Sequence, residues 1–93
     1  MINKKAKGAR QERKAKKILE LAGYNVTKVG ASLGIFDLVA INRHKIKLIQ
    51  VKSNYISPEE KEQIALFANC PENTSKEIWI FRDFQKEPII KYY

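Results

Sequence analysis

The stretch IFDLVAINRHKIKLIQVKS, residues 35–53, decides the fold of this chain. Two runs of mostly aliphatic residues, 35–41 and 46–52, flank the short polar link 42–45. Such runs around a tight polar connection predict a β-hairpin. With Arg43 and His44 at the tip, the register places Asp37 opposite Gln50, and behind them the apolar pairs Val39–Leu48 and Ile41–Ile46.

The end of this hairpin away from its tip is polar. Side chains of a strand alternate between the two faces, so Asp37, Gln50 and Lys52 are expected to share one face. An acid, an amide and an amine would each cost on the order of a few kcal/mol if buried without a partner. These groups therefore need partners, and a hydrated metal ion is a suitable one.

Patterns on either side of the hairpin complete an α/β domain. Ser57-Pro58-Glu59-Glu60 is a helix start, with serine as the N-cap, proline in the first helical position and glutamate three residues after the cap. The order predicted is α-β-β-β-α-β-β, a central mixed sheet flanked by helices in one domain over residues 1–93. The remaining elements expected are the helix 8–22, the strand 24–29, the loop 30–34, the strands 77–82 and 88–92, and an end of the second helix at 68 or 69.

The first predicted helix brings a further acid. Glu12, Ala15, Leu19 and Ala22 recur at helical spacing, so they share the face expected to pack on the sheet. We expect this helix to cross the sheet so that Glu12 reaches the Asp37–Gln50 end. Hard cations such as Mg²⁺ prefer oxygen ligands. The ligands predicted from the strands and the helix are Glu12, Asp37, the Gln50 side-chain oxygen and the Val51 carbonyl. Lys52 would then lie beside a metal-bound water and a phosphate group, where its ammonium would orient that water for attack on the phosphate.

Charge points to a polyanion as partner. The net charge is +8, and the first seventeen residues hold eight lysines and arginines against one acid, Glu12. Clustered cations release counterions from nucleic acid, although a solubilising segment or a membrane-surface contact would carry the same charge. Residues 1–7 are read as a basic arm. The phosphate contacts predicted from the basic residues are Lys4, Lys5, Lys7, Arg10 and Arg13, with Arg43 and Lys45 at the hairpin tip.

Several classes of protein are disfavoured. No apolar run approaches the ~20 residues that a membrane span needs, and none follows the basic N-terminus as in a secretory signal. A single cysteine, Cys70, fits a reducing compartment, and we expect a cytoplasmic location. No small-molecule cofactor beyond a metal is expected. Cys70 is interpreted as a small apolar filler and His44 as a turn residue.

Three segments together resemble a known family. They are Lys7-Gly8-Ala9-Arg10-Gln11-Glu12-Arg13, Phe36-Asp37-Leu38-Val39-Ala40 and Ile49-Gln50-Val51-Lys52-Ser53. This set resembles the archaeal Holliday junction resolvases of the PD-(D/E)XK nuclease superfamily. The resemblance implies a restriction-endonuclease-like fold and Mg²⁺- or Mn²⁺-dependent cleavage of DNA at four-way junctions, often by a homodimer.

The resemblance carries over residue by residue. Glu12 matches the family's helix acid, Asp37 its strand acid and Lys52 its lysine. Gln50 stands where the family usually has glutamate, which keeps an oxygen ligand but removes a negative charge. Ser32 matches a serine that resolvases place near the phosphate.

Other interpretations remain open from the sequence. Gln50 is also compatible with a flap or branch nuclease of another branch of the superfamily, or with a DNA-binding module of the same fold that has no activity. Glu12 would also suit an exposed ion pair with Lys16, four residues on. Asp37 and Lys52 would also suit a purely structural charge pair.

Overall fold

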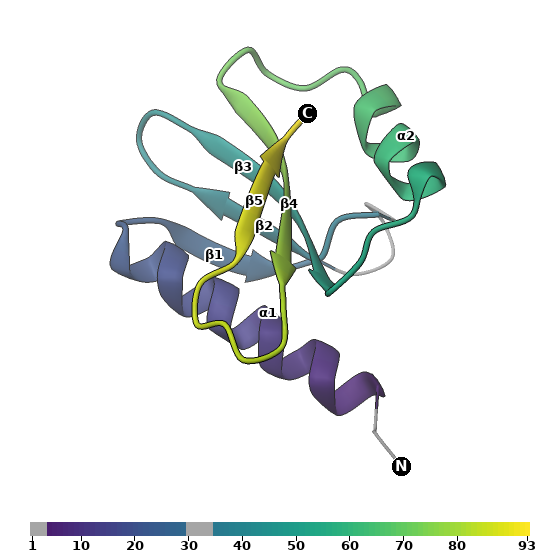
Figure 1. Cartoon of the computed structure of the whole chain (residues 1–93). Coiled ribbons are helices and arrows are strands. Elements are labelled where there is room, and N and C mark those ends of the chain that lie inside the picture. The colour runs from purple at the N-terminus through teal and green to yellow at the C-terminus, as the bar shows by residue number, and fades with distance from the viewer. Residues whose placement is uncertain (1–3, 30–34) are drawn as a thin grey trace.

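The predicted order of elements is confirmed. A computed structural model describes residues 4–29 and 35–93 as α-β-β-β-α-β-β (Figure 1). Ser32 and the loop predicted at 30–34 lie outside the described residues. The elements are α1 (Lys4–Leu21), β1 (Asn25–Lys28), β2 (Leu38–Ile41), β3 (Ile46–Ser53), α2 (Pro58–Leu66), β4 (Thr74–Phe81) and β5 (Ile89–Tyr92).

The hairpin of β2 and β3 has the predicted register. The strands are antiparallel, with Val39 opposite Leu48 and Ile41 opposite Ile46. The Asn42 side-chain oxygen accepts hydrogen bonds from the backbone N–H groups of His44 (2.9 Å) and Lys45 (2.8 Å), which closes the turn. His44 is exposed in this turn, in agreement with its interpretation as a turn residue.

All the strands belong to one mixed sheet with the order β1-β2-β3-β4-β5. β3 and β4 are parallel, whereas the other neighbouring strands are antiparallel. Parallel neighbours need a crossover connection, and α2 supplies it. The predicted capping box begins α2: the Ser57 side chain accepts from the Glu60 N–H, and the Glu60 side chain accepts from the Ser57 N–H.

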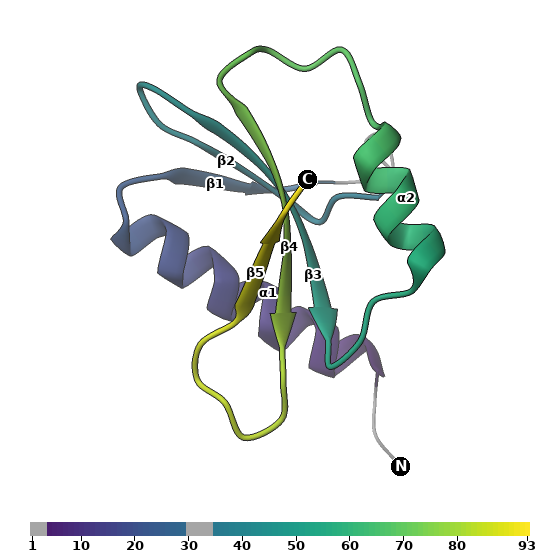
Figure 2. The ribbon, with the colours of Figure 1, turned by 45° about the horizontal axis from the view of Figure 1, so that its top comes forward.

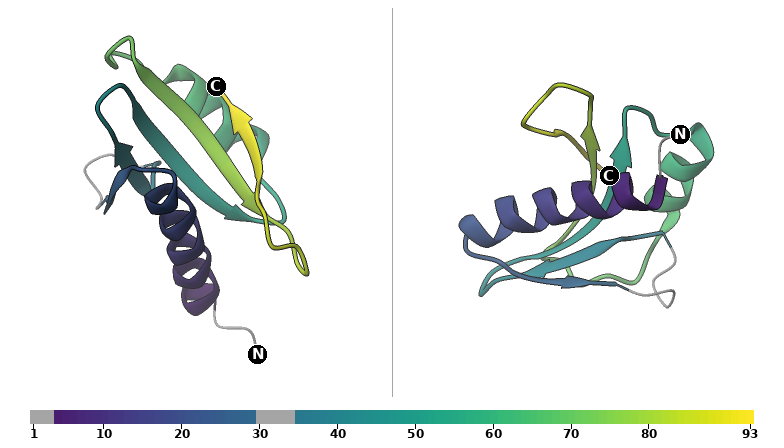
Figure 3. Two further views of the ribbon diagram at one scale, coloured as in Figure 1. Left: turned by 90° about the vertical axis from the view of Figure 1, so that its left-hand side faces the viewer. Right: turned by 90° about the horizontal axis from the view of Figure 1, so that it is seen from below.

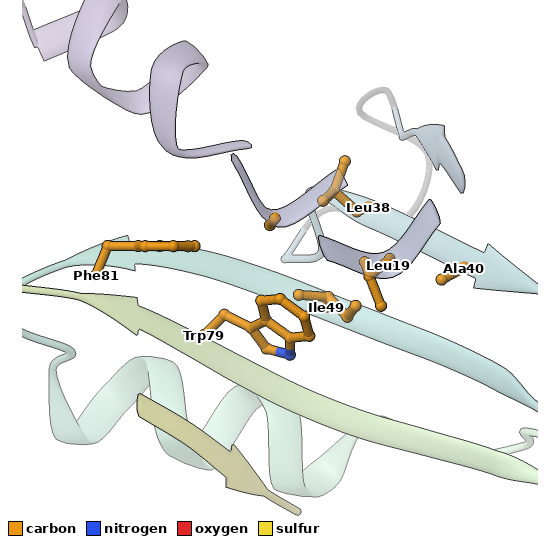
Figure 4. Close-up of a cluster of buried hydrophobic side chains, with 7 residues drawn as sticks. Leu19, Leu38, Ala40, Ile49, Trp79 and Phe81 are labelled. Atoms are coloured by element: carbon orange, nitrogen blue, oxygen red, sulfur yellow. The ribbon is translucent and has the colours of Figure 1, made fainter. Parts of the chain in front are cut away.

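The two helices pack on opposite faces of the sheet (Figure 3). Buried residues of α1 join one cluster with alternate residues of the strands, including Leu38, Ile49 and Trp79 (Figure 4). The other alternate residues form a second cluster with α2, which contains Leu48, Ile56, Ile64, Ile78 and Ile80. Both faces of the sheet are therefore apolar and each needs its own cover.

Some predicted boundaries are wrong. β2 begins at Leu38, so residues 35–37 are not part of the strand, and α1 begins at Lys4, so most of the expected arm 1–7 is helix. Ala22 does not pack on the sheet, because α1 ends at Leu21 and the chain turns at Gly23, whose φ is 94°.

α2 ends at Leu66, before the predicted 68 or 69. The Lys76 ammonium of β4 donates to the carbonyls of Ile64, Ala65 and Phe67 at 2.9–3.0 Å. A tertiary contact thus satisfies carbonyl groups that a further helical turn would have bonded.

A buried acid lies in the α1-side core. Glu77 of β4 is fully buried, and its carboxylate lies 3.1 Å from the Lys47 ammonium. It also accepts from the Ser75 hydroxyl (2.8 Å) and the Trp79 indole N–H (2.9 Å). A buried charge is tolerated only when it is paired in this way. Within the described residues, no helix combines the length and the apolar character needed to cross a membrane.

Candidate active site

Asp37 occupies the open end of the β2–β3 ladder. Its N–H donates to the Ile49 carbonyl (2.8 Å), and its side-chain oxygen accepts from the Val51 N–H (2.7 Å). Backbone N–H groups of a strand lie near the plane of the sheet. The carboxylate is therefore held at the edge between the two faces, where groups from either face can approach it.

The surroundings of Asp37 disfavour its charge. Burial and the nearby charge of Glu12 raise the pKa of Asp37, although the Val51 N–H and the charges of Lys52 and Lys28 act in the opposite direction. The net result is a partly buried acid that is harder to ionise than an ordinary aspartate. An acid in this state gains from a nearby cation.

Glu12 approaches from the α1 face, as expected for the helix acid. Its carboxylate lies 3.6 Å from the Lys28 ammonium of β1. The sequence offered Lys16 as an alternative ion-pair partner for Glu12, whereas the ion pair found joins Glu12 to Lys28 of a neighbouring strand. Next to Glu12, the buried Gln11 accepts a hydrogen bond from the Ser53 hydroxyl, which joins α1 to the end of β3. Sequence reasoning assigned no role to Gln11.

Gln50 approaches from the opposite face. It lies on the side of β3 that faces α2, whereas Glu12 lies on α1, which covers the other face of the sheet. The reason is the alternation of the strand: α1 covers the odd-numbered residues of β3 and leaves the even-numbered ones to α2. Glu12 and Gln50 therefore reach the edge of the sheet from its two sides.

Glu60 of α2 connects Gln50 with Lys52. One of its carboxylate oxygens accepts from the Gln50 amide (3.3 Å) and lies 2.5 Å from the Lys52 ammonium. Although burial alone would raise the pKa of Glu60, hydrogen bonds from Lys52 and Ser57 lower it below its ordinary value. Lys52 thus pairs with Glu60, and the structural Asp37–Lys52 pair considered above is not the contact that forms.

Sequence reasoning missed this role of Glu60, because it treated the residue only as part of the helix cap. One signal was available. Gln50 leaves the expected motif one carboxylate short, and Glu59 and Glu60 are the next acids along the chain. Only the packing of α2 on β3 shows which of the two faces the site.

The residues at this edge fit a cation. Gln50 is 8% exposed, and its buried side-chain oxygen has no hydrogen-bond partner within residues 4–29 and 35–93. A buried acceptor without a donor is costly, and a hard cation would satisfy it. In the described part of the chain, no three side chains of the His, Cys, Asp or Glu type already form a metal-binding group. The predicted set has only two acids, and its other oxygens come from an amide and a backbone carbonyl.

The predicted DNA contacts divide into two regions. Arg10 and Arg13 are exposed on α1 near the site. Arg43 and Lys45 are exposed at the hairpin tip, at the far end of β3 from Lys52. Seven residues of extended strand separate Lys45 from Lys52, or about 23 Å. The tip would therefore contact DNA well away from the site, while the side chains of Lys4, Lys5 and Lys7 lie outside the described part.

The topology is that of the restriction-endonuclease-like nucleases, a mixed five-stranded sheet between two helices. The sequence comparison is more specific. Residues 3–89 match the archaeal Holliday junction resolvase (Hjc) family. The chain therefore belongs to this family, and it is a nuclease that acts on Holliday junctions.

A solved structure supports this assignment. It is the 1.6 Å structure of Hjc from Archaeoglobus fulgidus, described as a Holliday junction resolvase from an archaeal hyperthermophile. The two chains share 26% sequence identity with a TM-score of 0.69, over 94% of this chain and 71% of that one. A search of curated proteins found no match.

Proposed function

We propose that this nuclease hydrolyses DNA phosphodiester bonds with a divalent cation, Mg²⁺ or Mn²⁺, held at the edge of the sheet by Glu12, Asp37, Gln50 and the Val51 carbonyl. The observation that carries the proposal is the position of Asp37. It is held by the Val51 N–H between the charges of Glu12 and Lys52, in surroundings that raise its pKa. Perturbed acids at such a position are typical of functional sites.

The orientation of Val51 and Gln50 supports the ligand set. The N–H and C=O groups of one strand residue point to the same side, so the Val51 carbonyl is directed toward the side on which Asp37 lies. Glu60 accepts a hydrogen bond from the NH₂ group of Gln50, and among the residues that the structure describes the Gln50 oxygen has no hydrogen-bond donor. When bound, the cation would polarise the phosphate and lower the pKa of water.

Lys52 would act on the substrate side of the site. Its ammonium would orient the attacking water and offset the negative charge that develops at phosphorus. Glu60 would serve as a positioning residue, because its contact holds the Lys52 ammonium and the Gln50 amide at one oxygen. The proposed catalytic residues are therefore Glu12, Asp37, Gln50 and Lys52, and Glu60 acts through the last two.

We further propose a homodimer acting on branched DNA in the cytoplasm. A four-way junction has approximate twofold symmetry, and two copies of one chain related by a twofold axis would present two such sites to it. The exposed Arg10 and Arg13, with Lys4, Lys5 and Lys7, would hold phosphates beside the site. Sizing chromatography tests the dimer: elution at the position of a 10.8 kDa chain, with and without junction DNA, would contradict it.

Cleavage of a labelled four-way junction tests the proposed reaction. We expect cutting in Mg²⁺ or Mn²⁺, none in EDTA, and none by Asp37→Ala with either ion. Flaps, single strands and linear duplexes serve as competing substrates, and equal cutting of all of them would contradict junction specificity. If neither protein cuts while both bind the junction tightly, the chain is a binding module and the proposed chemistry is wrong.

A further inference from the structure

A basic pocket that the proposed reaction does not use lies between α1 and the loop joining β4 to β5. Its volume is about 390 Å³. Four cationic side chains line it, from both the helix and the loop, and one acid, Asp83, is also present. The cations are Arg10, Lys14, Arg82 and Lys86, and Gln11 and Phe84 also line the pocket.

Phe84 is an unusual residue for this position. Its side chain is fully exposed (107%), so the ring adds nothing to either core cluster. Its φ is 65°, in the left-handed region that bulky residues rarely adopt. Single exposed apolar residues are common on proteins, but this one combines a strained backbone with a place in the lining of a pocket that four cationic side chains share.

The loop is held close to the proposed active site. The Asp83 N–H donates to the Asn54 side-chain oxygen (3.0 Å), and the Asn54 amide donates to the Asp83 carboxylate (3.3 Å). Asn54 lies two residues beyond Lys52, which is about 7 Å along an extended strand. Figures 1 and 2 show the loop and the end of β3 at the same edge of the sheet, beside the N-terminal half of α1.

Gln11 forms a second connection between the pocket and the proposed active site. It lines the pocket, follows Arg10 and precedes Glu12, and it bonds to Ser53 of β3. Because Lys52 lies on the α2 side of β3, a DNA strand with a phosphate at Lys52 would pass around this edge of the sheet and past Gln11 to reach the pocket. At about 3.4 Å per nucleotide along a stacked strand, 7 Å corresponds to roughly two nucleotides.

We propose that this pocket binds one unstacked nucleotide of the junction, with its base against the Phe84 ring and its flanking phosphates held by Arg10, Lys14, Arg82 and Lys86. Aromatic rings bind bases of any sequence by stacking, and clustered cations bind the backbone. A branch point has bases that leave the stack more easily than those of a linear duplex. The placement next to the cleaved bond rests on the proposed function, whereas the binding itself does not.

Binding measured in EDTA tests the proposal without cleavage. We expect Phe84→Ala to bind a four-way junction about 5- to 150-fold more weakly than the unchanged protein, which corresponds to about 1–3 kcal/mol for one stacked base. Its affinity for a linear duplex should not change. Phe84→Trp should keep junction binding and Phe84→Leu should lose it, because leucine is apolar but has no ring. Leu66→Ala, which removes another exposed apolar side chain (72% exposed), is the matched control.

A second measurement locates the base. A junction with 2-aminopurine placed in turn at each branch-point position should change its emission at one position on binding, and Phe84→Ala should abolish that change. Equal junction affinity of Phe84→Ala and the unchanged protein would overturn the proposal. So would equal losses on junction and duplex, or a loss of dimer on sizing chromatography, which would show that the ring covers a second copy of the chain.

The two proposals fail separately. If Asp37→Ala still cuts while Phe84→Ala still loses junction binding, the metal site is wrong and the nucleotide pocket stands. If Asp37→Ala is inactive and Phe84→Ala binds normally, the pocket is wrong and the metal site stands.

Discussion

Restoring the family's usual glutamate by Gln50→Glu is expected to destabilise the metal-free protein. The substitution would place a second carboxylate about where the Gln50 amide lies, 3.3 Å from the Glu60 oxygen. Two unit charges at that distance repel by about 5 kcal/mol at an effective dielectric constant of 20, and by about 1 kcal/mol in water. Glu60 is 28% exposed and Lys52 lies beside the same oxygen, so we expect a loss of about 2 kcal/mol.

This loss is measurable as a fall in melting temperature. For a chain of 93 residues, 2 kcal/mol corresponds to about 8–16 °C in EDTA. Added Mg²⁺ should recover most of the loss, because a cation offsets the repulsion and a carboxylate is a stronger ligand than an amide. Titration calorimetry should show Mg²⁺ bound about tenfold more tightly by Gln50→Glu, or about 1.4 kcal/mol.

A double variant that carries both Gln50→Glu and Glu60→Gln, and so exchanges the two residues, is the matched control. It keeps one acid and one amide at the same contact, so it should recover at least half of the stability lost by Gln50→Glu alone. If the exchanged protein is as unstable as the single variant, charge repulsion is not the cause. If Gln50→Glu melts like the unchanged protein and binds Mg²⁺ no more tightly, Gln50 lies outside the ligand set and the reasoning is refuted.

Three further substitutions test the site and the core. Asp37→Asn should stabilise the metal-free protein at about pH 7 but not at about pH 3. The pKa of Asp37 is raised in the folded protein, so ionising this side chain costs folding free energy as the pH rises above 3.8, its ordinary pKa. Urea unfolding in EDTA measures this, and a variant no more stable than the unchanged protein at either pH would contradict it. Lys52→Ala should abolish cleavage and leave junction affinity nearly unchanged, since the phosphate contacts are spread over many cations; a large loss of affinity in a binding titration would contradict the assigned role. Glu77→Gln should lower the free energy of unfolding by about 3 kcal/mol, because it leaves the Lys47 charge without its partner, and adding Lys47→Met should recover most of that loss in urea unfolding.

Local rules predicted the hairpin and the second helix well. The register of Val39 with Leu48 follows from the length of the turn, and the start of α2 follows from Ser57, Pro58 and Glu60. Both depend on residues close together in the chain. The wrong end of α2 depends on a distant residue, because Lys76 of β4 binds the last carbonyls of the helix.

For the candidate site, the sequence proposed the residues, whose roles stay predictions, but not how they are arranged. Asp37 and Lys52 were placed by strand alternation and family resemblance, and Glu12 by helical spacing. The alternation rule also identified the face of Gln50, but no rule applied to the sequence stated which helix would cover that face. The approach of Glu12 and Gln50 from opposite sides of the sheet therefore came only from the packing of the two helices.

The sequence by itself determined the order of elements, the register of the hairpin, and the ordered set Asp37, Gln50 and Lys52. Each of these follows from the types and spacing of residues that are close together in the chain. Only the tertiary structure decided that Glu60 joins Gln50 to Lys52, that Glu77 is buried against Lys47, and that Phe84 lines the same pocket as four cationic side chains. These contacts join residues from different elements. They form where apolar faces pack, and the polar side chains beside those faces take the partners that the packing brings to them.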